Sequence, residues 1–181
     1  MNVAVIPLNQ MAGPSASVLV SLQSPPSWRE ILADMASEFH DSESAAVAPP
    51  PSFGHNLRDP SNQRPFVGSI DEHCNTNGQW PETDAEVAAI KSLTGRDFTH
   101  SIVVAAMCNQ DIDHQTLCWL LSQIAIEYNG MVDFDMLNAP YSELSMVKCE
   151  WSSEDGNGWT VLGDAASCDL WLAHPQFRMV K

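Results

Sequence analysis

Hydrophobic positions in the middle of the chain change their spacing twice, and each change marks a new element. Residues 101–107 form a continuous apolar run rich in β-branched side chains, which predicts a strand buried on both faces. Asp113 is placed to cap a helix, in which apolar residues then recur every three or four positions as far as Tyr128. Gly130 is expected to end this helix in the left-handed conformation.

Residues 131–137 alternate between apolar and acidic side chains. This period of two predicts a second strand, with three apolar residues on one face and Asp133 and Asp135 on the other. The middle of the chain is therefore predicted to fold as strand, helix, strand, and we expect the remaining elements to be arranged around this unit.

The N-terminal half shows weaker patterns. Residues 17–22 are a strand candidate. The two prolines before Ser27 block a helix up to that point, and Ser27 can cap a helix over 27–40, where apolar residues have helical spacing. Residues 41–80 are rich in proline and predict an irregular crossing loop, in which 66–70 form a possible short strand.

The later elements are short and are separated by turn-forming residues. They are a helix over 84–93 ended by Gly95, a strand over 144–151, a hairpin turn over 155–158, its partner strand over 159–163 and a helix over 165–172. This order predicts an α+β fold: a single domain over 1–181, with a mixed or mainly antiparallel sheet and helices mostly on one face.

Charge adds a constraint on the partners of the chain. It carries 23 acidic and 8 basic residues, a formal net charge of −15, and it has no Lys or Arg between Arg96 and Lys148. A chain this acidic repels nucleic acid and anionic membrane surfaces and attracts basic proteins. We therefore expect neither direct nucleic-acid binding nor membrane binding.

The cysteines and the N-terminus predict the compartment. Five cysteines form no disulfide framework, and Cys108 and Cys118 fall in apolar segments, where reduced cysteine behaves as a small hydrophobic residue. The N-terminal residues lack the pattern of a signal peptide, and no apolar run approaches the roughly 20 residues of a membrane span. These features predict a cytoplasmic protein.

Catalytic and cofactor sites have weak support in the sequence. His73 and Cys74 are the adjacent pair closest to a metal motif, but no second pair complements them, so we expect neither a metal nor a cofactor. Cys108 with His100 or His114 could form a nucleophile and base. The pair Asp133 and Asp135 could act in acid–base catalysis, although an exposed strand face is the simpler interpretation.

Acidic and aromatic residues converge instead near the predicted hairpin. Exposed aromatic side chains flanked by carboxylates are typical of an interface with a basic protein. The candidate binding residues are Asp133, Asp135, Glu143, Glu150, Trp151, Glu154, Asp155 and Trp159.

Two stretches of the C-terminal half carry a resemblance. They are residues 128–134 (Tyr-Asn-Gly-Met-Val-Asp-Phe) and the tail 171–181, which contains Trp-Leu-Ala-His-Pro-Gln-Phe-Arg-Met. They resemble a small bacterial domain family that ends in Trp-x-x-His-Pro-x-Phe-Arg-Met and is similar to the immunity proteins of polymorphic toxins, including type VI secreted effectors. The resemblance implies a non-catalytic cytoplasmic protein that binds and inhibits a secreted toxin, here most simply a nuclease such as a DNase.

The tail itself is expected to be structural. Trp171 and Phe177 should pack under the sheet, and Arg178 is free to bind a carboxylate or a carbonyl group. Two further functions stay open on the sequence: a small hydrolase or transferase that uses Cys108, His100 or the aspartate pair, and an adaptor or chaperone for an effector. The sequence leaves the oligomeric state undetermined.

Overall fold

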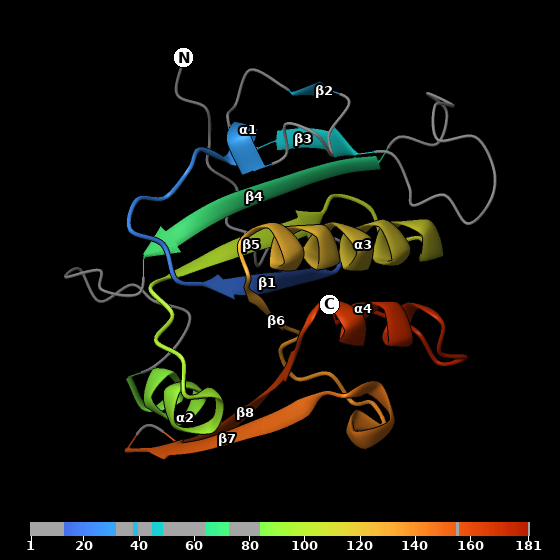
Figure 1. The fold of residues 1–181 in the computed structure, drawn as a ribbon. Coiled ribbons are helices and arrows are strands. Elements are labelled where there is room, and N and C mark those ends of the chain that lie inside the picture. Colours follow the sequence, from blue (N-terminus) through green and yellow to red (C-terminus); the bar gives the residue numbers. More distant parts are fainter. Residues whose placement is uncertain are drawn as a thin grey trace.

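The computed structural model describes residues 13–31, 38–39, 45–48, 64–72, 84–154 and 156–180. Its elements are β1 (Ser15–Val20), α1 (Trp28–Ile31), β2 (Glu38–Phe39), β3 (Ala45–Ala48), β4 (Arg64–Glu72), α2 (Asp84–Thr94), β5 (His100–Ala106), α3 (Asp111–Glu127), β6 (Met131–Asp133), η3 (Tyr141–Leu144), β7 (Val147–Ser153), β8 (Gly156–Gly163) and α4 (Ala165–Leu172). The strands form one sheet in the order β2-β3-β4-β5-β1-β6-β8-β7, and each neighbouring pair is antiparallel (Figure 1). The fold class is α+β, as the sequence predicted.

The predicted strand, helix, strand unit lies at the centre of this sheet. It consists of β5, α3 and β6, and β1 is inserted between its two strands and pairs with both. Because β1 runs antiparallel to each of them, β5 and β6 run parallel to one another. The long helix α3 connects them across one face of the sheet (Figure 1).

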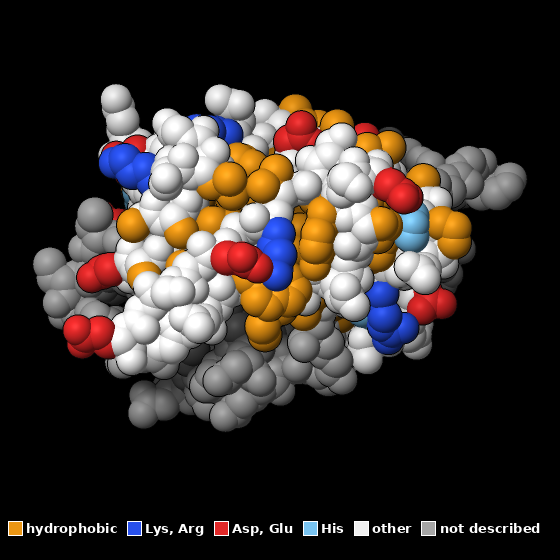
Figure 2. Space-filling model, turned by 90° about the horizontal axis from the view of Figure 1, so that it is seen from below, with side chains coloured by type: hydrophobic (Ala, Val, Ile, Leu, Met, Phe, Trp, Pro, Cys, Tyr) orange, Lys and Arg blue, Asp and Glu red, His pale blue; other side chains and the backbone are white. Residues whose placement is uncertain are grey.

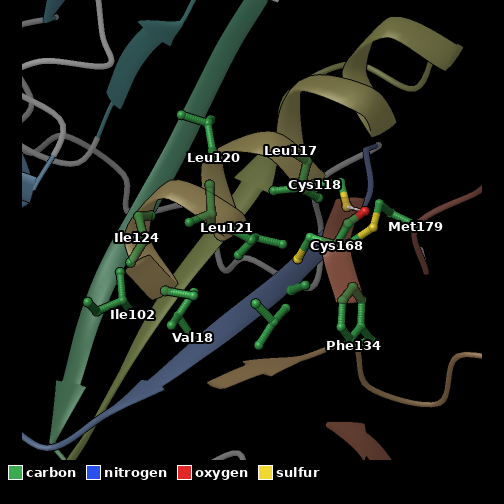
Figure 3. Packing of buried hydrophobic residues seen from close by; sticks show 14 of the residues in the cluster. Val18, Ile102, Leu117, Cys118, Leu120, Leu121, Ile124, Phe134, Cys168 and Met179 are labelled. Atoms are coloured by element: carbon green, nitrogen blue, oxygen red, sulfur yellow. Dashed lines mark hydrogen bonds between the residues drawn. The ribbon is translucent and has the colours of Figure 1, made fainter. Parts of the chain in front are cut away.

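The main core lies between this face and the helices α3 and α4. Val18 of β1 and Ile102 of β5 point toward Leu117, Leu121 and Ile124 of α3, and all five side chains are fully buried (Figure 3). The leucine and isoleucine spacing in the sequence therefore did identify the buried face of the helix. Helix α1 joins the same core through Trp28 and Ile31, so three of the four α-helices in the described part of the chain cover one face.

The opposite face of the sheet is covered at one end. Helix α2 packs against β7, and a smaller cluster of Leu19, Ile90, Phe98, Cys149 and Leu162 fills the space between helix and sheet. Away from α2, the same face is lined by small and polar residues. This asymmetry of the two faces positions the candidate site.

The boundaries of α3 differ from those predicted. The residue at the N-cap position is Gln110, and Asp113, which was predicted to cap the helix, lies inside its first turn. From there the Asp113 carboxylate accepts a hydrogen bond from the backbone N–H of Gln110 at 2.7 Å and stabilises the start of the helix. At the other end, Asn129 takes the positive φ of 47° that was expected of Gly130. Gly130 is needed for another reason: a Cβ there would come within 2.5 Å of Val18 Cγ1.

The predicted strand over 131–137 is wrong in its length. Strand β6 ends at Asp133, and Asp135 has a positive φ of 55°, which turns the chain and breaks the alternation. Because of this turn Met136, predicted to lie on the apolar face of the strand, is 58% exposed. Asp133, which is still within β6, is only 8% exposed.

The N-terminal half holds more strand than the sequence indicated. Helix α1 corresponds to the start of the predicted helix over 27–40. The predicted C-terminal end of that helix is wrong, because Glu38 and Phe39 form β2 and pair with β3. Strand β3 falls inside the predicted irregular loop over 41–80. The possible short strand over 66–70 is confirmed, but β4 extends it at both ends to nine residues. The N-terminal apolar residues before Gly13 lie outside the described part of the chain.

The hairpin is also shifted. Ser153 pairs with Gly156, and Gly156 and Gly158 belong to β8, not to the turn. The C-terminal tail packs as predicted: Trp171 is 2% exposed, and its ring contacts the Phe177 ring edge-to-face at 5.7 Å. Arg178 lies 4.0 Å from the carboxylate of Asp111. Within the described residues, no helix has the length and apolarity required to cross a bilayer.

Candidate functional site

A cavity of about 490 Å³ opens on the sheet face that α3 and α4 leave uncovered. Its walls include residues of six strands, β1, β4, β5, β6, β7 and β8, and one residue of α2. Its polar lining residues are Asp71, Glu86, Asp133, Asp135, Ser15, Ser17, Ser101 and Thr160, and Trp151 and Trp159 are its aromatic residues. We call this feature the acidic cavity.

Strand register explains why these residues meet. Asp71 of β4 pairs with Ser101 of β5, and Ser17 of β1 pairs with Asp133 of β6, so each pair projects from the same face. The alternation of strands sends the neighbouring apolar residues, such as Ile102, into the core on the other side. The acidic cavity is therefore the polar face of the same strands that build the core.

Asp133 is the carboxylate held most firmly. Its Oδ1 atom accepts hydrogen bonds from the Thr160 hydroxyl and, at 2.8 Å, from the backbone N–H of Asp135. Burial raises the pKa of Asp133 to about 6, although both hydrogen bonds act in the opposite direction. Asp133 therefore lies near the midpoint of its titration just below neutral pH.

Ser101 is the second polar group at the floor of the cavity. Its side chain is fully buried, and its Oγ atom has no hydrogen-bond partner among the described residues. A buried hydroxyl without a partner costs free energy, on the order of 1–3 kcal/mol. This cost indicates that the position serves something other than the packing of the fold.

The two tryptophans differ in their orientation. Trp151 pairs with Gly158, and its indole lies over that glycine so closely that a Cβ there would come within 2.5 Å of Trp151 Cζ2. Trp159 pairs with Glu150 on the other face of the hairpin, and Lys148 Nζ lies 4.7 Å from its ring centroid. Both residues line the cavity, but strand pairing places the Trp151 side chain on the face of the sheet that bears the cavity and the Trp159 side chain on the other face.

The charges around the cavity have one sign. Four carboxylate residues line it, and none of the lining residues in the described structure is Lys or Arg. Several described cations have partners elsewhere: Lys91 binds Asp97 at 2.8 Å, Lys148 binds Glu150 at 2.6 Å, and Arg96 binds the carbonyl of Asn129. Asp71, Asp133 and Asp135 therefore face no Lys or Arg side chain among the described residues that line the cavity.

The predicted binding residues divide into two groups. Asp133, Asp135, Trp151 and Trp159 line the acidic cavity together. Glu143, Glu150 and Glu154 are exposed outside it, and Glu150 is paired with Lys148. Asp155 lies outside the described residues.

The surface viewed from the β7 side agrees with this division. Figure 2 shows hydrophobic atoms across the middle of that surface, while carboxylates lie singly around them. The carboxylates on this surface therefore do not form a continuous acidic patch.

Six polar residues of the cavity were not expected from the sequence: Asp71, Glu86, Ser15, Ser17, Ser101 and Thr160. The available signal was the position of polar residues within strands: Ser17 alternates with apolar residues, and Ser101 stands at the start of a run otherwise apolar. Asp71 was hidden because β4 was predicted to end at residue 70. Glu86 reaches the cavity from α2, and only the packing of that helix reveals this.

The proposed thiol site does not converge. His100 begins β5 and Cys108 follows its end, so the strand separates them by roughly 20 Å. His114 is buried, and its two ring nitrogens are bound to Asn109 Oδ1 at 2.9 Å and to the backbone N–H of Met179 at 3.1 Å. Neither histidine is placed to activate Cys108.

No group of three or more metal-binding side chains is found within the described residues. The pair His73 and Cys74 lies outside them. The carboxylates of the cavity come from β4, from β6 and the turn after it, and from α2, which suits a ligand larger than a single ion.

Comparison with known proteins gives one match. No curated protein and no solved structure matches the chain. A family model described as a family of unknown function, DUF6368, matches residues 12–181 and so includes every strand and helix of the described fold. The chain with the acidic cavity therefore belongs to the DUF6368 family.

Proposed function

We propose that this chain is a non-catalytic immunity protein of the cytoplasm that binds a basic secreted toxin and blocks its active site. The observation that carries the proposal is the acidic cavity, whose carboxylates have no Lys or Arg beside them among the described lining residues. A protein surface with the opposite charge would compensate them.

A nuclease toxin is the class of partner that fits best. An enzyme that cleaves nucleic acid must bind phosphates, and its active-site cleft is therefore basic. Carboxylates of an inhibitor can take the place of these phosphates. The net charge of −15 would also speed the encounter of the two proteins, which is useful when a toxin must be inhibited soon after entry.

Co-expression tests this function directly. The protein encoded beside this chain should be toxic when produced alone in a host cell, and production of this chain should restore growth. Replacement of Asp71 and Asp135 by Asn should reduce the rescue, whereas the matched replacement of Glu143 and Glu154 by Gln, outside the cavity, should leave it intact. A non-toxic neighbour, or a chain that affects only toxin delivery, would contradict the immunity function and favour an adaptor.

One observation favours a second candidate, an enzyme that uses acid–base catalysis. Asp133 combines burial in a cavity with a pKa of about 6, which suits a general acid, and Asp135 beside it is exposed. This function requires turnover of a substrate that Asp133→Asn abolishes. Asp133→Asn is expected to weaken the rescue if Asp133 only binds the toxin, and to abolish it if the rescue requires catalysis by Asp133, so even partial rescue by this variant would exclude such a catalytic role.

A further inference from the structure

We propose that the acidic cavity receives a single arginine side chain projecting from the basic partner, and that this residue determines which partner is bound. The inference rests on the proposed function, because it assumes that the occupant belongs to a protein. It goes further by naming the chemical group that enters and the residues that hold it.

Charge is the first reason for a cationic group. Asp71 and Asp133 come from strands on opposite sides of β1 and β5, so the carboxylates surround the cavity from more than one side. A cation within such a site interacts with several carboxylates at once, in surroundings that water screens only in part. A neutral or anionic group would leave Asp71, Asp133 and Asp135 without a cation among the described residues of the cavity lining.

The buried hydroxyl of Ser101 is the second, independent reason. It is fully buried at the floor of the cavity and has no hydrogen-bond partner among the described residues. A guanidinium group carries five N–H donors, so it can bind the carboxylates and still donate to a hydroxyl oxygen. A group that enters this far would remove the cost of the unpaired hydroxyl.

Trp151 distinguishes arginine from lysine. Its indole lies over Gly158, which has no side chain to separate the ring from the strand, and it forms part of the cavity wall. A planar guanidinium can stack on an indole face while it donates hydrogen bonds in its own plane. The compact ammonium group of lysine cannot make both contacts in the same way.

The size of the cavity agrees with this occupant. Its volume of about 490 Å³ falls within the range of roughly 300–1,000 Å³ that is usual for small-molecule sites. The cavity is therefore large enough for a side chain with accompanying water, but it is far smaller than a protein domain. The partner must insert a projecting residue.

Small arginine compounds test the inference without the partner. The full chain, labelled with ¹⁵N, is titrated with N-acetyl-arginine amide, with the neutral isostere N-acetyl-citrulline amide and with N-acetyl-lysine amide. The indole N–H signal of Trp151, assigned by its loss in Trp151→Phe, should shift saturably with the arginine compound and about tenfold more weakly or not at all with the other two. Equal shifts with the lysine compound, or no saturable shift with arginine, would overturn the proposal.

Two variants identify the site. Ser101→Ala and Asp133→Asn should each weaken binding of the arginine compound by about tenfold. Glu143→Gln, which removes a carboxylate outside the cavity, should leave it unchanged, and circular dichroism checks that each variant is folded. If Ser101→Ala and Glu143→Gln behave alike, the hydroxyl is not part of a binding site.

The two proposals can fail separately. If this chain rescues cells from the neighbouring toxin but does not bind the arginine compound, the immunity function stands and the arginine inference falls. If it binds the arginine compound selectively but rescues no cell, the site stands and its ligand is not a toxin.

Discussion

The hydroxyl group of Thr160 donates a hydrogen bond to Oδ1 of Asp133, across the strands that floor the acidic cavity. Both residues are buried, Thr160 at 1% and Asp133 at 8% exposure. The bond connects the stability of the sheet to the ionisation of a carboxylate in the candidate site, and both consequences can be measured.

Replacement of Thr160 by Val keeps the shape of the side chain and removes this bond. We expect a loss of about 1–3 kcal/mol in the free energy of unfolding at pH 7.5, because a buried carboxylate loses a donor. Chemical denaturation measures the change. Thr116→Val is the matched control: Thr116 is equally buried, but it donates to the Ile112 carbonyl, so its effect should be the same at pH 7.5 and pH 5. If the effect of Thr160→Val is also the same at both pH values, the loss of stability does not come from the hydrogen bond to Asp133.

Asp133 should make the stability depend on pH. Its pKa is about 6 in the folded chain and is near 3.8 when the residue is exposed to water, so the folded state holds the proton more tightly. Stability from this group is therefore largest at low pH and is lost as the pH rises from about 4 to above 6, by a total on the order of 3 kcal/mol. Asp133→Asn cannot titrate, so its stability relative to the wild type should increase over this range. A constant difference between the two denaturation curves would refute the buried titration.

His114 should make the packing of the C-terminal tail depend on pH, in the opposite direction from Asp133. Its Nδ1 atom accepts the backbone N–H of Met179, and burial is the main cause that lowers its pKa. The neutral ring is therefore favoured by folding, and stability from this group is lost as the pH falls below the ordinary value near 6.5. Hydrogen exchange at Met179, corrected for the intrinsic rate, should accelerate there, while His114→Gln should remove the pH dependence. Unchanged protection down to pH 5 would exclude this role.

Gly158 should hold Trp151 in place. Gly158→Ala introduces a methyl group where the indole lies, so the ring must move, at a cost of about 1–3 kcal/mol. The NMR signal of the Trp151 indole N–H and the free energy of unfolding report this change. Asn157→Ala, at the exposed neighbouring position of the same strand, is the matched control and should alter neither. If both variants keep the indole signal, the close contact is not a constraint.

Local patterns were sufficient for much of the fold. The apolar run of β5, the helical spacing of α3 and the boundaries of α4 follow from local patterns in the sequence. A continuous apolar run indicates a strand buried on both faces, and helical spacing indicates a helix with one buried face. Periodicity failed where a strand was short or the chain turned, as at Asp135, since a positive φ leaves no mark in the spacing of apolar residues. It also missed β3 and both ends of β4, where prolines lie beside or within the strands.

The sequence by itself determined the acidic character of the protein and the absence of basic residues from the segment between Arg96 and Lys148. It also indicated Asp133, Asp135, Trp151 and Trp159 as candidates. The tertiary structure decided that these residues line one cavity and that Asp71, Glu86 and Ser101 join them. The physical reason is strand register: pairing brings together residues that lie far apart in the chain, and local spacing carries no information about which strands become neighbours.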